Sequence, residues 1–392
     1  MRLPVHAMTL TSALGRGNEV TFAALQSRRG GLAHQRFLDV AFESPTGVVS
    51  GLDSVALPPA MAAFDCRNNR LAELALQQDG FAEAVLAARE RFGASRIGVY
   101  IGTSGAGILD VELGYRARDA QGALPSTLRY REVMNLFSPG AYVMDRFGLA
   151  GPAAVVSAAC ASSAKAFAAA SRAITAGLCD AAIVGGVEAL CLTTLYGFRS
   201  LELLSGAPCR PCDRDRDGIS LGEAAGYVLL AREEGPTGLA LAGYGESADA
   251  HHLSTPHPEG VGAAMAMRDA LAMAGLAPAA LDYVNLHGTG TRTNDLAEDV
   301  AIRSVLGDAV PRGSTKGWTG HTLGAAGIVE AVITLLSMRG GLLPGTLNCN
   351  QVDPAIRGNV ELAGRHASVR RALSNSFGFG GSNCALVFES AS

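Results

Sequence analysis

One arrangement of segments occurs twice along this chain, and this repeat constrains the fold more than any other feature. In each half a short apolar stretch runs into a turn and then into a long helix-like stretch rich in small residues; the two turns lie at Cys160 and at 316–321. Each half then ends in a glycine-rich turn followed by an apolar strand-like stretch, at 218–230 and at 375–388. The repeat indicates an internal duplication of one folding unit.

The seam of the duplication is expected at Gly235–Gly238, where glycine and proline interrupt the apolar pattern. We therefore expect an N-terminal half, residues 1–235, and a C-terminal half, residues 236–392. Strand-like and helix-like stretches alternate in both halves, which is typical of the α/β class with strands buried on both faces. Pseudo-twofold packing of the halves would bring the helix starts at Cys160 and His321 together at one site.

The composition argues against several classes of partner. Hydrophobic residues make up 48% of the 392 residues and charged residues only 17%, so we expect extensive buried surface, part of it a subunit interface. The net charge of −4 does not favour a nucleic-acid partner. No uninterrupted apolar run reaches the roughly 18–20 residues of a membrane span, and the N-terminus lacks the apolar core of a signal peptide.

The cysteines predict neither a disulfide scaffold nor a metal site. All eight are scattered along a long chain, which favours a reducing cytoplasm. Cys209 and Cys212 form a C-x-x-C pair. Since no second pair and no histidine at ligand spacing accompanies them, we expect no metal.

Cys160 stands between an apolar strand-like stretch and the helix-like residues 161–176. A thiol at a helix N-terminus has its pKa lowered by the helix dipole, which favours the thiolate. Adjacent backbone N–H groups can also stabilise a developing oxyanion. A lone cysteine is more often a small buried core residue, so this position by itself does not establish a nucleophile.

Two histidines favour the nucleophile. His287 lies in the segment LHGTGT at 286–291, and His321 lies in KGWTGHTLGAAG at 316–327. Each stands at a glycine-rich turn after a strand-like stretch, where one histidine alone is as often structural as catalytic. A cysteine together with two such histidines is the pattern expected of nucleophilic catalysis with imidazole partners.

Four motifs resemble a known family: VSAACASS around Cys160, HGTGT, KGWTGHTLGAAG, and NSFGFGGSN at 375–383. They are similar to motifs of the β-ketoacyl-acyl-carrier-protein synthases of the elongating class, and the resemblance covers nearly the whole chain. It implies the thiolase fold, with duplicated halves in a five-layer α-β-α-β-α sandwich. It also implies a decarboxylative Claisen condensation of an acyl thioester with malonyl-acyl-carrier protein, in fatty-acid or specialised polyene or polyketide synthesis.

The resemblance also implies the partners. The substrates would be carried on the phosphopantetheine arm of an acyl carrier protein, so no separate cofactor is expected. The family is dimeric, which implies a homodimer or a heterodimer with a paralogous synthase subunit. An acidic carrier protein would meet a basic surface, and Arg67 and Arg70 fall where the family places such residues.

The resemblance assigns the chemistry to five residues. Cys160 would take the acyl group, while His287 and His321, both neutral, would donate to the malonyl thioester oxygen as carbon dioxide leaves. The backbone N–H groups of Cys160 and Phe379 would form a second oxyanion hole, and the Phe379 ring would gate the acyl pocket. Lys316 is expected to order the site rather than to act as the general base.

Further residues are implied in supporting roles. Glu330 is expected to pair with Lys316, since a buried charge needs a partner, and Asp295 is expected to be structural. The implied substrate-binding residues are Thr289 and Thr291, which would hold the phosphopantetheine amides, with Phe377, and with Gly105, whose small size implies an open pocket floor.

Some residues depart from the family pattern. Cys212 and Ile219 replace residues that are usually aromatic, which is compatible with a specialised pathway but does not distinguish it from primary fatty-acid synthesis. Cys384 follows GGSN, and thiolases carry a second catalytic cysteine in a C-terminal turn, so a thiolase is one alternative, although Cys384 lacks their Cys-x-Gly surroundings. A non-catalytic chain-length-factor subunit is another alternative, against which the intact Cys160 and both histidines argue.

Overall fold

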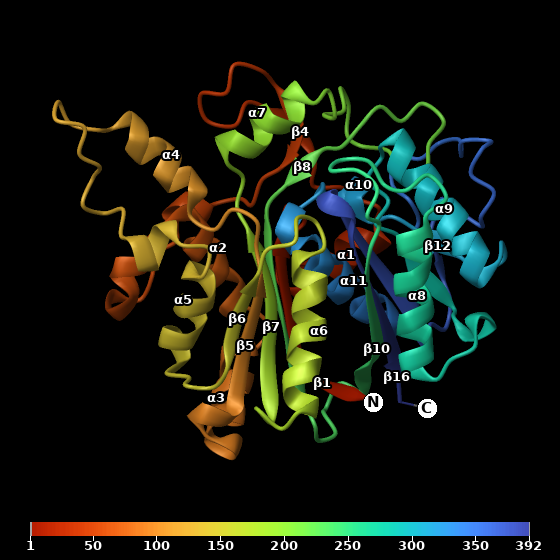
Figure 1. Cartoon of the computed structure of the whole chain (residues 1–392), viewed down its shortest axis with the longest axis horizontal. Helices are drawn as coiled ribbons and strands as arrows, with labels where there is room; N and C mark the ends of the chain where they lie inside the picture. The colour runs from red at the N-terminus through yellow and green to blue at the C-terminus, as the bar shows by residue number, and fades with distance from the viewer. Residues whose placement is uncertain (1, 392) are drawn as a thin grey trace.

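The computed structural model describes residues 2–391, and these residues form an α/β fold around one large sheet (Figure 1). The sheet contains eleven strands, ten of them in the order β12-β11-β15-β16-β10-β1-β9-β7-β5-β6. Those of the first half are β1 (Leu3–Ser12), β5 (Ile97–Gly102), β6 (Ala153–Val156), β7 (Ala181–Glu188) and β9 (Ala224–Ala231). Those of the second half are β10 (Leu239–Ala248), β11 (Tyr283–Asn285), β12 (Arg312–Gly313), β15 (Arg371–Gly378) and β16 (Ser382–Ser390).

The strand order repeats between the halves. Read from the outer edge inward, the first half runs β6-β5-β7-β9-β1 and the second runs β12-β11-β15-β16-β10, which is the same order when the strands are numbered within each half. The pairings repeat as well, because β5 and β11 each lie between two parallel neighbours, while the strands that follow them pair antiparallel. The halves join where β1 pairs with β10. This repeat is the structural form of the duplication; the boundary at residue 235 stays a prediction.

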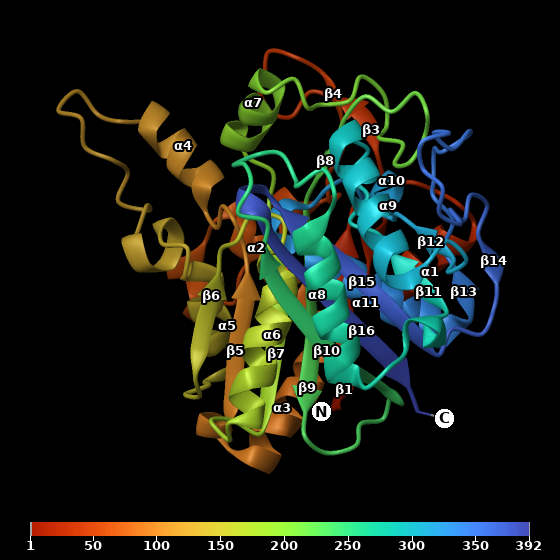
Figure 2. The same cartoon turned by 45° about the vertical axis from the view of Figure 1, so that its right-hand side comes forward.

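The strands of the first half and those of the second form two half-sheets of the large sheet. Two central helices lie between the half-sheets, and other helices cover their outer faces (Figure 2). The central pair is α6 (Ser162–Thr175) and α11 (Ala326–Gly340), which contact each other and strands of both halves. The outer layers are α2 (Arg67–Leu76), α3 (Phe81–Phe92) and α5 (Ser138–Phe147) on one half-sheet and α8 (Val261–Ala274) and α9 (Arg292–Leu306) on the other. The five-layer thiolase arrangement implied by the resemblance is thereby confirmed.

Small residues allow the central helices to approach closely. A Cβ added to Gly327 on α11 would lie 2.5 Å from the backbone nitrogen of Ala164 on α6. Only glycine therefore fits at this crossing. The high alanine and glycine content of both segments thus follows from their burial between two sheets.

Shorter elements complete the chain. The remaining helices are α1 (Asn18–Gln26), α4 (Ile108–Arg116), α7 (Leu192–Ser200) and α10 (Lys316–Thr319). The remaining strands are β2 (Gly15–Arg16), β3 (Ala33–Gln35), β4 (Ser44–Gly47), β8 (Leu221–Gly222), β13 (Leu342–Leu343) and β14 (Arg365–His366). Helix α4 and the segment that follows it project from the body in both views (Figures 1 and 2).

Within residues 2–391, the stretch Leu323–Gly340 is long and apolar enough to cross a membrane by length and composition, although Glu330 and Arg339 interrupt its apolar run. It contains the whole of the central helix α11, and 89% of the stretch is buried inside the fold. Its apolarity is therefore explained by its place between the two half-sheets.

Candidate active site

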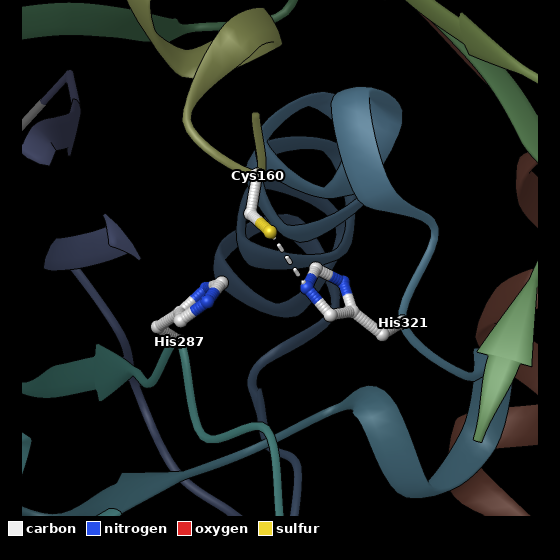
Figure 3. Close-up of side chains that lie close together, drawn as sticks. All are labelled: Cys160, His287 and His321. Atoms are coloured by element: carbon white, nitrogen blue, oxygen red, sulfur yellow. Dashed lines mark hydrogen bonds between the residues drawn. The ribbon is translucent and has the colours of Figure 1, made fainter. Parts of the chain in front are cut away.

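Folding brings together the three side chains that the sequence singled out (Figure 3). Cys160 precedes α6, His287 follows β11, and His321 precedes α11. The sulfur of Cys160 lies 3.0 Å from Nε2 of His321, and the rings of His287 and His321 meet edge to face with centroids 5.3 Å apart. One potential ligand atom from each of the three side chains lies within 4.8 Å of the other two. The predicted convergence is confirmed.

The histidine tautomers are set by the donors at Nδ1. The backbone N–H of Leu323 donates to Nδ1 of His321 at 3.3 Å, and Nζ of Lys316 lies 3.3 Å from Nδ1 of His287. With Nδ1 accepting, each ring carries its hydrogen on Nε2. Burial, followed by the nearby Lys316 ammonium, holds the pKa of both histidines well below its usual value. Both rings are thus neutral and carry their hydrogen on Nε2. The sequence predicted neutral donors without specifying the nitrogen.

These tautomers also decide how a metal would fit the cluster. One sulfur and two imidazoles are a donor set that zinc accepts in other proteins. Here, however, metal binding at Nε2 would require both rings to give up their Nε2 hydrogens and lose the hydrogen bonds at Nδ1. The arrangement suits hydrogen-bond donation rather than metal ligation.

The predicted low pKa of the Cys160 thiol is wrong. Burial raises the pKa of this thiol to about 11, and the opposing effects of the Lys316 ammonium and the Phe379 backbone N–H are smaller. Helix α6 begins two residues later, at Ser162, and the thiol lies beneath the surface. The helix dipole alone would lower the thiol pKa, but at this position desolvation outweighs it.

A buried ion pair supports the site. Nζ of Lys316 binds the carboxylate of Glu330 and also donates to the backbone carbonyl of His287. Both charged side chains are almost fully buried, and burial raises the pKa of Glu330 to about 7. Lys316 thus links α11 to the turn that carries His287, which fits the ordering role predicted for it.

Two carboxylates on α9 hold the His287 loop. Asp295 accepts from the backbone N–H groups of Gly290 and Cys212 and pairs with buried Arg216, as expected of a structural residue. Glu298, one helical turn further on, accepts from the backbone N–H groups of His287 and Gly288, both at 2.8 Å. Glu298 was not predicted from the sequence; its spacing of three residues from Asp295 on one helix was the available signal.

A pocket opens onto the three side chains. Its apolar lining includes Phe379, whose ring lies 5.9 Å from that of Phe198 between centroids. The predicted substrate residues Thr289, Thr291 and Phe377 line it together with Cys160, His287 and His321.

The predicted positions of Gly105 in the pocket and of Arg67 on the surface are wrong. Gly105 does not line this pocket; a Cβ there would lie 2.9 Å from Oε1 of Glu188, so a packed carboxylate explains its small size. Arg67 is only 8% exposed and binds Glu223 and Asp53 rather than presenting a free charge. Arg70 is half-buried and pairs with Asp65. Arg67 does not belong to the predicted carrier-protein surface, because its guanidinium is buried in an ion pair with Glu223.

The other cysteines lie outside the chemistry. Cys384 is fully buried within β16 and does not line the pocket, so it does not act as a second nucleophile beside Cys160. Cys212 donates its backbone N–H to Asp295 and packs in the core of the second half.

Comparisons with known proteins agree with this geometry. The family model "Beta-ketoacyl synthase, N-terminal domain" matches residues 58–235, and "Beta-ketoacyl synthase, C-terminal domain" matches residues 239–350. The chain is 33% identical to 3-oxoacyl-[acyl-carrier-protein] synthase 2 of Vibrio cholerae serotype O1 over 99% of both chains. It is 35% identical to the synthase of the same name from Mycobacterium bovis, over 98% of this chain and 96% of that one.

Solved structures give the same answer. A ketosynthase from Xenorhabdus doucetiae, in complex with its chain length factor, superposes with a TM-score of 0.90 at 36% identity and covers 99% of this chain and 98% of that one. A β-ketoacyl synthase from Burkholderia phymatum superposes with a TM-score of 0.87 at 28% identity, over 99% of both chains. The chain belongs to the β-ketoacyl synthase family. Its activity is the carbon–carbon bond-forming acyl transfer of a 3-oxoacyl-acyl-carrier-protein synthase.

Proposed function

We propose that this chain is the catalytic ketosynthase of a pair whose second subunit is a chain-length factor, and that it extends acyl chains on a carrier protein in a specialised polyene or polyketide pathway. The observation that carries the catalytic part is the convergence of Cys160, His287 and His321 at the end of one apolar pocket. The 36% identity to a ketosynthase solved with its chain length factor supports the partner.

The first step is acyl transfer to Cys160. The sulfur attacks the thioester carbonyl carbon of the carrier-bound acyl group, and the phosphopantetheine sulfur leaves with the proton that the Cys160 thiol gives up. The backbone N–H of Phe379 is hydrogen-bonded to the Cys160 sulfur. Together with the N–H of Cys160, it would face the thioester carbonyl oxygen as that oxygen becomes negatively charged.

The second step is decarboxylation and condensation. As malonyl-carrier loses carbon dioxide, negative charge gathers on its thioester oxygen, and two Nε2–H groups stabilise that oxygen. The enolate carbon then attacks the acyl carbonyl on Cys160, the Cys160 sulfur leaves, and one proton is taken up to restore the thiol. The product is a 3-oxoacyl-carrier longer by two carbons. Neutral histidines suit this step because they need not lose a proton.

Substrate entry would use the polar rim of the pocket. The hydroxyls of Thr289 and Thr291 lie 2.9 Å apart, and both residues line the pocket beside the histidines. They are placed to bind the phosphopantetheine amides. No separate cofactor is needed, because the carrier arm brings both substrates as thioesters.

An exposed apolar arm supports a partner subunit. Along α4 and the segment after it, Tyr115 and Tyr130 are 50% and 70% exposed, and Leu113 and Leu136 are also exposed. Exposed apolar side chains on a projecting arm are typical of a subunit interface. The cysteines of the described residues are free and buried, which supports a cytoplasmic location.

A homodimeric elongating synthase is the second candidate, since the curated relatives at 33–35% identity are 3-oxoacyl-acyl-carrier-protein synthases. The two candidates differ in what the purified chain does alone. The proposal predicts that the chain alone is acylated but extends chains poorly until a chain-length factor is added. Robust extension by the chain alone would favour the homodimer.

The test uses a panel of acyl-carrier proteins, with the acyl group mapped by mass spectrometry of the Cys160 peptide. We expect one class of acyl chain to accumulate on Cys160 and to block its alkylation by iodoacetamide. Absence of any acyl group on Cys160, with normal folding by circular dichroism, would contradict the proposal and favour a non-catalytic subunit. Cleavage of acetoacetyl-CoA without malonyl decarboxylation would indicate a thiolase.

A further inference from the structure

Glu188, the last residue of β7, has no role in the chemistry described above, yet it is buried beside it. The side chain is 2% exposed. A buried carboxylate is costly unless several donors surround it. Its contacts therefore indicate what it is retained for.

The donors to Glu188 come from two loops. Oε2 accepts from the backbone N–H and the hydroxyl of Ser104, at 2.6 and 2.8 Å, and from the backbone N–H of Gly324 at 3.0 Å. The backbone N–H of Gly105 also faces the carboxylate. Glu188 thus ties the 103–105 loop to the 322–325 turn that follows His321.

The turn fits tightly against the carboxylate. A Cβ added to Gly324 would lie 2.4 Å from Oε2 of Glu188 and 2.6 Å from the backbone nitrogen of Ser104. The preceding residue, Leu323, has a φ of +49°, a conformation that is strained for a bulky side chain and persists only where surrounding contacts impose it. The hydrogen bond from Gly324 to Glu188 is one such contact.

The strained residue is the one that sets the tautomer of His321. The N–H of Leu323 donates to Nδ1 of His321, and this bond leaves the hydrogen on Nε2, where the reaction needs it. The backbone of His321 itself is held elsewhere, by Ser220 and Gly222. Glu188 therefore acts on the turn and, through the turn, on the ring, without holding the histidine directly.

We propose that Glu188 is a positioning residue that keeps His321 in the Nε2–H tautomer by fixing the 322–325 turn. This inference rests on the proposed condensation, because it matters only if His321 donates from Nε2. Burial also raises the pKa of Glu188 to about 7, as expected for a carboxylate whose neighbours are backbone and hydroxyl donors rather than cations.

The test compares Glu188→Gln and Glu188→Ala with a matched control, Glu73→Gln. Glu73 is a fully buried glutamate on α2 that binds Tyr142 and Arg146, away from the pocket. Two rates are measured on each protein: acylation of Cys160 and decarboxylation of malonyl-carrier. Nitrogen-15 spectra of labelled histidine, with His321 assigned through a His321→Ala variant, report the tautomer.

We expect Glu188→Gln to slow decarboxylation about tenfold relative to acylation, since it weakens one preorganised donor without removing it. Glu188→Ala should show the larger loss, and glutamine the partial rescue, because the amide oxygen can still accept from Gly324. Relative to the wild type, the His321 spectrum should change in both Glu188 variants and stay the same in Glu73→Gln. An unchanged tautomer, or equal loss of both rates, would overturn the proposal.

Failure of the proposed function would look different. If the wild-type protein neither acylates Cys160 nor decarboxylates malonyl-carrier, the condensation proposal falls while the nitrogen-15 spectra still decide the role of Glu188. If Glu188→Ala does not fold, the spectra and the rate ratio of Glu188→Gln decide alone.

Discussion

The turns before the two central helices occupy matching places in the duplicated halves, yet they are built for different tasks. Both contain a non-glycine residue with positive φ, Ala159 at +48° and Leu323 at +49°. The first turn is held by the hydroxyl of Ser162, which accepts from the N–H of Ala158 at 2.9 Å and donates to the carbonyl of Ala159. The second is held by the carboxylate of Glu188.

The difference follows from the charge that each turn must tolerate. Cys160 passes through an anionic sulfur, and a carboxylate directly beside it would raise the thiol pKa further. His321 stays neutral and only donates, so a buried anion at its turn does not oppose the chemistry. The two helix starts therefore carry different supports: a hydroxyl beside the proposed nucleophile and a carboxylate beside the proposed donor.

Removing the nucleophile should have the largest effect. Cys160→Ala should abolish the acyl-enzyme and lower condensation by about 10³-fold or more, because no other group can carry the acyl chain. Malonyl decarboxylation should persist, since both histidines stay in place. Intact-protein mass spectrometry measures the acyl-enzyme. The control is Cys384→Ala, which should acylate normally; loss of acylation in that variant would revive the thiolase interpretation.

Removing either donor should come next. His321→Ala and His287→Ala should each slow malonyl decarboxylation by about 10²–10³-fold, the usual cost of one preorganised donor. Carbon dioxide release from malonyl-carrier measures this rate. The two losses should be similar in size, because in the proposed mechanism both rings donate from Nε2–H to one substrate oxygen. A histidine variant that retains the wild-type rate would show that only one imidazole serves the oxyanion.

The raised thiol pKa gives a smaller, graded effect. Because burial raises the pKa of the Cys160 thiol to about 11, the thiolate should be a minor species at neutral pH, and its fraction should rise about tenfold per pH unit. Iodoacetamide alkylation of Cys160 should therefore accelerate steadily from pH 7 to about pH 9. A rate that levels off below pH 8 would show that the thiolate is stabilised more than burial permits.

The mildest change tests the support of the first turn. Ser162→Ala removes a hydroxyl that bridges two backbone groups and should lower the free energy of unfolding by about 1 kcal/mol. Urea denaturation measures this loss. Acylation should slow only modestly, in contrast to the selective effect expected of Glu188 variants on decarboxylation. A selective loss of decarboxylation in Ser162→Ala would remove the distinction between the turns.

The sequence predicted those parts of the site that are encoded locally. Cys160, His287 and His321 each follow a strand-like stretch at a turn, and the duplicated pattern indicated that two helix starts would meet. Phe379 and Lys316 were implied only by the resemblance of the motifs that contain them to those of the synthases. The convergence was predicted from short segments and the symmetry of the repeat, whereas the chemical roles came from the resemblance.

The missed and mistaken parts depend on contacts between distant segments. Glu188 meets Gly324 across 136 residues, and no local pattern marks such a pair. Arg67 looked like a surface charge until the fold placed it against Glu223, 156 residues away. The thiol pKa was wrong for the same reason, since desolvation is set by everything packed around Cys160 and not by its own helix.

The most direct measurement of the central claim is a single-turnover chase. The enzyme is first acylated on Cys160 from an accepted acyl-carrier, freed of excess substrate and then mixed with malonyl-carrier. The account predicts that the acyl group leaves Cys160 as carbon dioxide is released, and that a 3-oxoacyl chain two carbons longer appears on the carrier in equal amount. Carbon dioxide release with the acyl group still on Cys160, or hydrolysis of that group to free acid, would contradict it.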